Sequence, residues 1–165
     1  MTAPSGFSMN DFDAQAVAWM VKNVASDAAI LDVGAGYGKW GRLLKPTHSK
    51  IDALEVFPHN VLKYDLFHVY RRVHIDDVRR FKIEAYEFVI LGDLLEHLPV
   101  PDAQFVLARC RRALVQVPFL YKQGELDGNP YEVHVQDDLT AALVAERYPS
   151  LMPLAVNEKV GVYVK

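Results

Sequence analysis

The chain has 165 residues, of which 51% are hydrophobic, and its formal net charge at pH 7 is −3. A chain of this size can bury a sheet with helices on both faces, and its charge argues against a broad nucleic-acid-binding surface. Its single cysteine, Cys110, excludes an internal disulfide and a thiolate metal cluster, and is typical of a reducing compartment. Because the sequence shows no membrane-spanning stretch and no signal-peptide core, we expect a cytoplasmic protein that does not bind membranes.

The chain opens with a Pro/Gly/Ser leader over residues 1–8, which is followed by a helical pattern over 10–25. Ser8 with Asp11 three residues later resembles a capping box, so we expect Ser8 to cap this helix. Its apolar stripe comprises Phe12, Ala16, Trp19, Met20 and Val24.

The next segment is the most informative one in the chain. A short apolar strand over 29–33 breaks into three alternating glycines, Gly34, Gly36 and Gly38, and a helix follows over about 37–45. Glycine permits the positive φ angles of a tight turn and lets a ligand approach the bare backbone. The helix N-terminus offers N–H groups to a polar or anionic ligand. This segment predicts a site for an adenosine-containing cofactor.

Two classes of cofactor fit the glycines. Gly36, Gly38 and Gly41 satisfy the dinucleotide pattern G-x-G-x-x-G, so an NAD-linked oxidoreductase is one alternative, although no catalytic residue pattern supports it. Asp32, two residues before the first glycine, is expected to face the pocket. A carboxylate there is a poor neighbour for pyrophosphate and a good one for a cationic amino group or a sulfonium.

Strands and helices alternate through the rest of the chain. The expected elements are a strand over 51–56, a short helix near 59–65, strands over 69–75 and 88–91, a helix over 101–112, a strand over 113–117, a helix from Asp137 or Asp138 to about Tyr148, and a hairpin over 154–164. Almost no helix is expected between the third and fourth strands. This alternation predicts an α/β fold with a doubly wound, mostly parallel seven-stranded sheet and a C-terminal antiparallel hairpin.

We expect a single domain over 1–165. Its parts would be an N-terminal leader and helix over 1–28, a cofactor-binding core over 29–118, an acceptor-side loop over 119–135, and a C-terminal helix and hairpin over 136–165. In open α/β sheets ligands bind outside the carboxyl ends of the strands, so the binding residues should follow those ends.

Two motifs resemble those of class I S-adenosylmethionine-dependent methyltransferases. The run from Asp32 to Gly38 reads Asp-x-Gly-x-Gly-x-Gly, which is similar to their first motif. The run from Asp93 to Leu98 reads Asp-x-Leu-Glu-His-Leu, as in many small-molecule methyltransferases. The resemblance covers residues 29–118 and the remainder by topology. It implies the Rossmann-like methyltransferase fold, with the last strand antiparallel between its neighbours, and S-adenosyl-L-methionine as cofactor.

The resemblance also implies which residues bind the cofactor. Glu55, at the end of the second strand, would accept both ribose hydroxyls, and Phe57 would lie along the adenine face. By spacing, Asp77 matches better than Asp76 the acid that takes the adenine amino group, with the backbone of Val78 reaching a ring nitrogen. The full implied set is Asp32, Gly34, Gly36, Gly38, Glu55, Phe57, Asp77, Val78 and Asp93.

Methyl transfer from a sulfonium depends mainly on positioning and on exclusion of water, and it needs a base where the acceptor loses a proton. The catalytic candidates are Asp93, at the cofactor–substrate junction, His97 and His134. In the family the pair Glu96-His97 often serves a structural role instead.

The loop over 119–135 contains Tyr131, Glu132 and His134. Loops of this length are usually functional or disordered. Its Gly-Asn-Pro-Tyr-Glu-x-His segment resembles one in some bacterial methyltransferases of glycan or secondary-metabolite pathways. We therefore expect acceptor-side groups here, with a turn of ordinary polar residues as the alternative.

No metal site is expected. The six histidines are scattered along the sequence, and none forms a zinc spacing with Cys110. A structural role for His97 is the alternative to ligation with Asp93.

These observations predict a methyltransferase whose acceptor is a small molecule, such as a sugar or a metabolite hydroxyl. The alternatives are an RNA or protein methyltransferase and a non-catalytic, cofactor-binding partner subunit; nucleic acid is disfavoured by the acidic charge balance. The chain is small for the family, which predicts a homo-oligomer or a partner chain.

Overall fold

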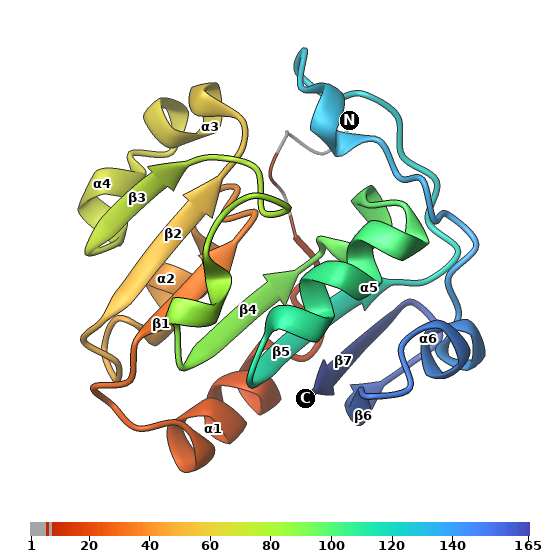
Figure 1. Ribbon diagram of the computed structural model, residues 1–165, viewed down its shortest axis with the longest axis horizontal. Helices are drawn as coiled ribbons and strands as arrows, with labels where there is room; N and C mark the ends of the chain where they lie inside the picture. Colours follow the sequence, from red (N-terminus) through yellow and green to blue (C-terminus); the bar gives the residue numbers. More distant parts are fainter. Residues whose placement is uncertain (1–5, 7) are drawn as a thin grey trace.

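A seven-stranded sheet forms the centre of the computed structural model, which describes Gly6 and residues 8–165 (Figure 1). The predicted leader therefore lies largely outside the described residues. The strands are β1 (Ile30–Val33), β2 (Ile51–Glu55), β3 (Arg72–Ile75), β4 (Phe88–Gly92), β5 (Ala113–Pro118), β6 (Met152–Val156) and β7 (Val160–Val164). Their order is β3-β2-β1-β4-β5-β7-β6; the first five are parallel, and β7 runs antiparallel to both β5 and β6. The predicted fold class, including the hairpin strand between its neighbours, is confirmed.

Helices cover both faces of this sheet (Figure 1). They are α1 (Asp13–Asn23), α2 (Lys39–Leu44), α3 (Pro58–Lys63), α4 (Leu66–Val69), α5 (Val100–Arg109) and α6 (Ala141–Arg147), with 3-10 turns η1 (Ile83–Ala85), η2 (Leu95–His97) and η3 (Pro130–Glu132). Between β3 and β4 the helical structure is the single turn η1, as the sequence predicts. Among the described residues, none of the helices combines the length and apolarity needed to cross a bilayer.

The central strands are buried on both faces, which is why they read as continuous apolar runs. Successive side chains alternate between the two faces, so Ile30 and Ile90 pack with α1 to α4, whereas Leu31 and Leu91 pack with α5 and α6. The edge strands β3 and β6 are partly exposed. Burial of each large apolar side chain contributes about 1.5–3 kcal/mol, so the two cores together hold the sheet between its helices.

The predicted starts of helix α1 and of strand β3 are wrong. Helix α1 begins at Asp13 and, within the described residues, has no side-chain cap, because the Ser8 hydroxyl donates to the Asp93 carboxylate instead. The strand predicted over 69–75 begins only at Arg72, because Leu66–Val69 form the helical turn α4.

The last helix is also shorter than predicted. It starts after Thr140, whose hydroxyl oxygen accepts a hydrogen bond from the Leu143 N–H at 3.2 Å. Asp138, expected to be a possible cap, forms an ion pair with Arg147 instead. Thr140 satisfies one of the N–H groups that a helix start leaves open, so it takes the role assigned to the aspartates.

Tyr70 joins three elements beneath the glycine loop. Its hydroxyl donates to the Asp32 carboxylate and accepts a hydrogen bond from the Gly41 N–H at 3.2 Å. Asp32 was expected to face the pocket, but alternation along β1 directs it to the face of Ile30 and hence to Tyr70. Burial raises the pKa of Asp32 to about 7, although the Tyr70 hydrogen bond and the Lys39 charge act in the opposite direction.

Gly41→Ala should destabilise the protein by about 1–3 kcal/mol, the usual cost of overpacking. A Cβ at this position would lie 2.4 Å from Tyr70 Cε1, which outweighs the higher helix propensity of alanine, worth about 1 kcal/mol. Urea denaturation measures the difference. Gly124→Ala is the matched control because no described residue lies within 4 Å of its Cβ position; equal stability of the two variants would contradict the packing argument.

Asp32→Asn should change the pH dependence of stability. Because the pKa of Asp32 rises from its ordinary value of 3.8 to about 7 in the folded protein, the folded state holds a proton between these values that the unfolded state has released. Unfolding free energy therefore falls as pH rises through this window in the parent protein and does not in the variant. Denaturation at pH 5 and at pH 8 should show that the variant gains stability relative to the parent as the pH rises from 5 to 8. A pH-independent difference would refute the raised pKa.

Candidate functional site

A cavity of about 220 Å³ opens at the carboxyl edge of the sheet. Its walls come from the glycine loop after β1, the ends of β2, β3 and β4, the N-terminal segment, and the loop after β5. This is where the strand order reverses direction between β1 and β4, and such a point is the usual ligand crevice of open α/β sheets. Seven predicted site residues line the cavity: Gly34, Gly36, Glu55, Asp77, Val78, Asp93 and His97. The predicted residues Asp32, Gly38, Phe57 and His134 lie outside this lining.

The glycine loop has the backbone that the sequence predicts. Gly34, Gly36 and Gly38 have φ angles of 68°, 51° and 82°, which side chains rarely adopt. A Cβ at Gly36 would lie 2.5 Å from the carbonyl oxygen of Gly6, so the N-terminal segment passes directly against the loop. The loop amides at Gly36 and Tyr37 donate to Glu55 and to the Gly6 carbonyl, respectively. Gly38 faces Leu66 rather than the cavity.

Glu55 is held rigidly at the end of β2. Its two carboxylate oxygens accept hydrogen bonds from the backbone N–H of Gly36 at 2.9 Å and of Phe57 at 2.8 Å. Burial raises the pKa of Glu55 despite these hydrogen bonds. The ring of Phe57 was expected along an adenine face; it lies beside His59 instead, with ring centroids 5.8 Å apart. Phe57 supports the site through its backbone, by orienting the carboxylate.

The end of β3 supplies two adjacent acids to the cavity. The Asp77 carboxylate accepts hydrogen bonds from Arg79 Nε at 2.9 and 3.0 Å, and the Arg79 hydrogen bonds lower the pKa of Asp77. Asp76 accepts from the Asp77 N–H and from Arg80. Val78 completes this wall. Asp77 is therefore an ionised acceptor with a fixed orientation.

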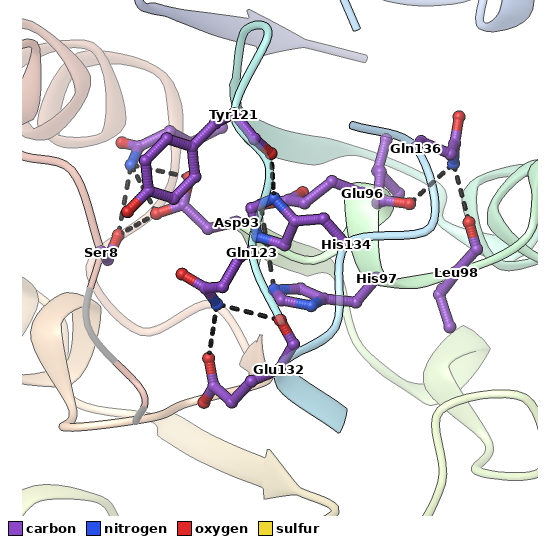
Figure 2. A network of polar contacts seen from close by, with 12 residues as sticks. Ser8, Asp93, Glu96, His97, Leu98, Tyr121, Gln123, Glu132, His134 and Gln136 are labelled. Atoms are coloured by element: carbon purple, nitrogen blue, oxygen red, sulfur yellow. Dashed lines mark hydrogen bonds and ion pairs between the residues drawn. The ribbon is translucent and has the colours of Figure 1, made fainter. Parts of the chain in front are cut away.

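Asp93 lies at the centre of a polar network (Figure 2). It has a φ of 52°, which is unusual for a residue other than glycine and occurs often at functional sites. Its carboxylate accepts from the Ser8 hydroxyl, from the Met9 N–H at 3.2 Å and from Gln116 Nε2 at 3.0 Å. Burial raises the pKa of Asp93, partly offset by the Ser8 hydrogen bond and by the charge of Lys39.

Lys39 and Trp40 are among the residues of the cavity wall that sequence reasoning missed. Lys39, directly after the last glycine, is buried and pairs with Asp13 at 2.7 Å. Trp40 lies against the end of β4, where a Cβ at Gly92 would be 2.2 Å from the indole Nε1. In the described part of the chain this buried N–H has no hydrogen-bond partner. The sequence Gly-Lys-Trp could have indicated both residues. A lysine and a tryptophan at the start of a helix, directly after a ligand-binding loop, are both placed to contact the ligand.

The loop after β5 brings a second group of residues to the cavity. Glu132 accepts from the Gly6 N–H at 2.7 Å and from Gln123 Nε2 at 3.0 Å, so it ties the N-terminal segment to this loop. Tyr131 and Glu132 line the cavity. The predicted acceptor-side loop thus contributes to the same cavity as the glycine loop.

His97 and His134 lie together although they are far apart in the sequence (Figure 2). Their ring centroids are 4.6 Å apart and their planes are nearly perpendicular. Burial lowers the pKa of His97 to about 4, and burial also lowers the pKa of His134, so both rings are neutral at pH 7. Glu96 is fully buried beside them, and burial raises its pKa well above the usual range. Periodicity gave no sign that these three residues meet.

No protein-family model matches the chain, and no curated protein matches it in sequence. Its fold is nevertheless similar to solved structures. Magnesium protoporphyrin IX methyltransferase from Synechocystis PCC 6803, with bound SAM, aligns at a TM-score of 0.65 and 13% identity over 92% of this chain and 76% of that one. A TehB-like SAM-dependent methyltransferase from Corynebacterium glutamicum aligns at 0.63 and 14%, over 91% and 85%. The complex of DhpI with SAM and HEP aligns at 0.66 and 13%, over 94% and 86%. At these identities the likeness concerns architecture, and the chain has the fold of solved SAM-dependent methyltransferases.

Proposed function

We propose that this protein binds S-adenosylmethionine in the cavity and transfers its methyl group to a small-molecule hydroxyl. The main support for the proposal is the convergence of three predicted features on one cavity: positive-φ glycines after β1, the buried carboxylate of Glu55 after β2, and the acid Asp77 after β3. The solved structures of the same fold with bound SAM support the choice of cofactor.

Glu55 is the residue that would hold the ribose. Each of its oxygens accepts one backbone N–H, and a carboxylate oxygen has two lone pairs, so each can accept a further hydroxyl proton. A ribose diol satisfies both oxygens at once, whereas the carboxylate of Asp93 in the same cavity would repel a pyrophosphate. The same argument favours a cationic sulfonium over NAD.

Asp77 would take the adenine amino group. Arg79 fixes its carboxylate in place and lowers its pKa, so it accepts hydrogen bonds and donates none at neutral pH. The exocyclic amino group of adenine is a donor and matches that requirement.

On the acceptor side, the proposed roles go to Asp93, His97 and His134. Methyl transfer breaks the carbon–sulfur bond, forms a carbon–oxygen bond and releases the hydroxyl proton, which a neighbouring group has to accept. Asp93 lines the cavity, and its raised pKa brings it closer to neutral pH, where a proton acceptor works best. His97, which lines the cavity, would orient the acceptor, and His134 would support the His97 ring from outside the lining. The acidic net charge and the cavity volume of about 220 Å³ favour a small molecule over RNA or a protein.

Calorimetric titration should show micromolar binding of S-adenosylhomocysteine and no binding of NAD in a parallel experiment. Binding of NAD alone would contradict the cofactor proposal. Release of S-adenosylhomocysteine from S-adenosylmethionine in the presence of hydroxyl-bearing acceptors would then establish turnover. Binding that is accompanied by no turnover with any acceptor class would favour the non-catalytic partner subunit.

Glu55→Gln should weaken S-adenosylhomocysteine binding about tenfold or more, because hydrogen bonds to a charged group are worth about 1.5–3 kcal/mol each. The variant keeps the size of the side chain and one acceptor oxygen, and thermal unfolding checks that the glycine loop is retained. Glu158→Gln, an exposed substitution in the β6–β7 turn, is the control. Unchanged affinity in Glu55→Gln would reject the ribose assignment.

A further inference from the structure

Glu96, His97 and His134 form a compact cluster between η2 and the loop after β5 (Figure 2). One oxygen or nitrogen atom from each residue lies within 4.8 Å of those of the other two. His97 Nε2 is 4.0 Å from Glu96 Oε1, which is too long for a hydrogen bond. A metal ion holds its ligand atoms at about 2.0–2.2 Å, so the three side chains would have to move toward one another when an ion binds.

Hydrogen bonds determine which ring nitrogens can coordinate. His97 Nδ1 lies 3.2 Å from the Val133 carbonyl oxygen, and His134 Nδ1 lies 2.7 Å from that of Tyr121. Because a carbonyl oxygen only accepts, Nδ1 carries the proton in both rings. In a neutral ring the other nitrogen, Nε2, then holds a lone pair. Backbone carbonyls that accept from the second nitrogen are the usual outer partners of metal-bound histidines.

The carboxylate of Glu96 is the independent observation that points to a ligand. It is fully buried, and within the described residues neither of its oxygens has a hydrogen-bond partner. A buried polar group without a partner costs free energy, and such groups in natural proteins call for an ion or a water molecule. The backbone around it is well paired, since the Glu96 carbonyl oxygen accepts from the N–H groups of Val135 and Gln136. The backbone of Glu96 is therefore held in place, whereas its carboxylate has no partner among the described residues.

Local charge also favours a cation. The carboxyl groups of Asp93 and Glu132 line the same cavity as His97, so acids that repel one another lie near the two histidines. A divalent ion would offset this repulsion.

We propose that Glu96, His97 and His134 bind a divalent first-row transition-metal ion. Two imidazoles and one carboxylate suit zinc, iron, cobalt or manganese, and three protein ligands leave coordination positions open. His97 lines the cavity, so an ion held by this ring would lie beside the cavity. This metal site was not expected from the histidine spacing in the sequence. If the proposed methyl transfer holds, on which this step rests, the ion would bind the acceptor oxygen and lower the pKa of its hydroxyl, with Asp93 taking the proton.

The test uses the full chain, freed of metal with a chelator and titrated with Co²⁺ and with Zn²⁺ in the absence of any cofactor. Calorimetry should show a single ion bound per chain, and Co²⁺ should develop visible d–d absorption bands typical of nitrogen and oxygen ligands. Glu96→Gln and His134→Gln should each weaken binding at least about 100-fold, because loss of even an outer partner of a metal ligand costs about 10–100-fold.

His68→Gln is the matched control, since this exposed histidine pairs with Asp65 on the surface. It should bind like the parent protein. Absence of binding to the parent, or equal binding in Glu96→Gln and in the parent, would overturn the proposal.

Thermal unfolding separates loss of the site from loss of the fold. Without metal, Glu96→Gln should melt no lower than the parent, because Glu96 has no side-chain hydrogen bond to lose in the described structure. With excess Zn²⁺, the parent should gain stability and the variant should not. The parent protein and Glu96→Gln should bind S-adenosylhomocysteine with equal affinity. Failure of the metal proposal would therefore show as absent metal binding, and failure of the cofactor proposal as absent S-adenosylhomocysteine binding.

Discussion

The parallel pairing of β1 with both β2 and β4 determines where every other part of the site can lie. Val33 lies in register with Leu54 on one side and Leu91 on the other, so the three strands end at the same edge. The connections from β1 and β4 then leave toward different faces of the sheet, and the crevice between them cannot be filled by either. The glycine loop, Glu55 and Asp93 follow these strand ends and meet there for that reason.

Three buried carboxylates at this edge differ in their hydrogen-bond partners, and this difference suits them to different ligands. Burial raises the pKa of Glu55, Asp93 and Glu96 alike. Backbone N–H groups fix Glu55, and Ser8, Met9 and Gln116 fix Asp93, so both are oriented before any ligand arrives. The carboxylate of Glu96 has no such partner among the described residues. The first two are therefore suited to hydrogen-bonded ligands, and the third to an ion.

The proposed acceptor side is built by segments that are distant in the sequence. Gly6 contacts the glycine loop and donates to Glu132, while Ser8 donates to Asp93. The loop after β5 carries His134 to His97. These contacts build one wall of the cavity, and a wall of this kind limits the access of water to a bound ligand.

Local sequence patterns were enough to predict the alternation of strands and helices, the glycine loop, and the acids Glu55 and Asp77 at strand ends. Apolar periodicity locates the end of each strand, and parallel topology brings these ends to one edge of the sheet. Only the tertiary structure decided which way the Asp32 side chain points. Side chains alternate between the two faces along β1, so Asp32 points to Tyr70 and away from the cavity. The same holds for the ring of Phe57 beside His59, for the entry of Lys39 and Ser8 into the site, and for the meeting of His97 with His134. Contacts of this kind depend on the path of loops and on side-chain packing across elements, and local sequence patterns carry no information about either.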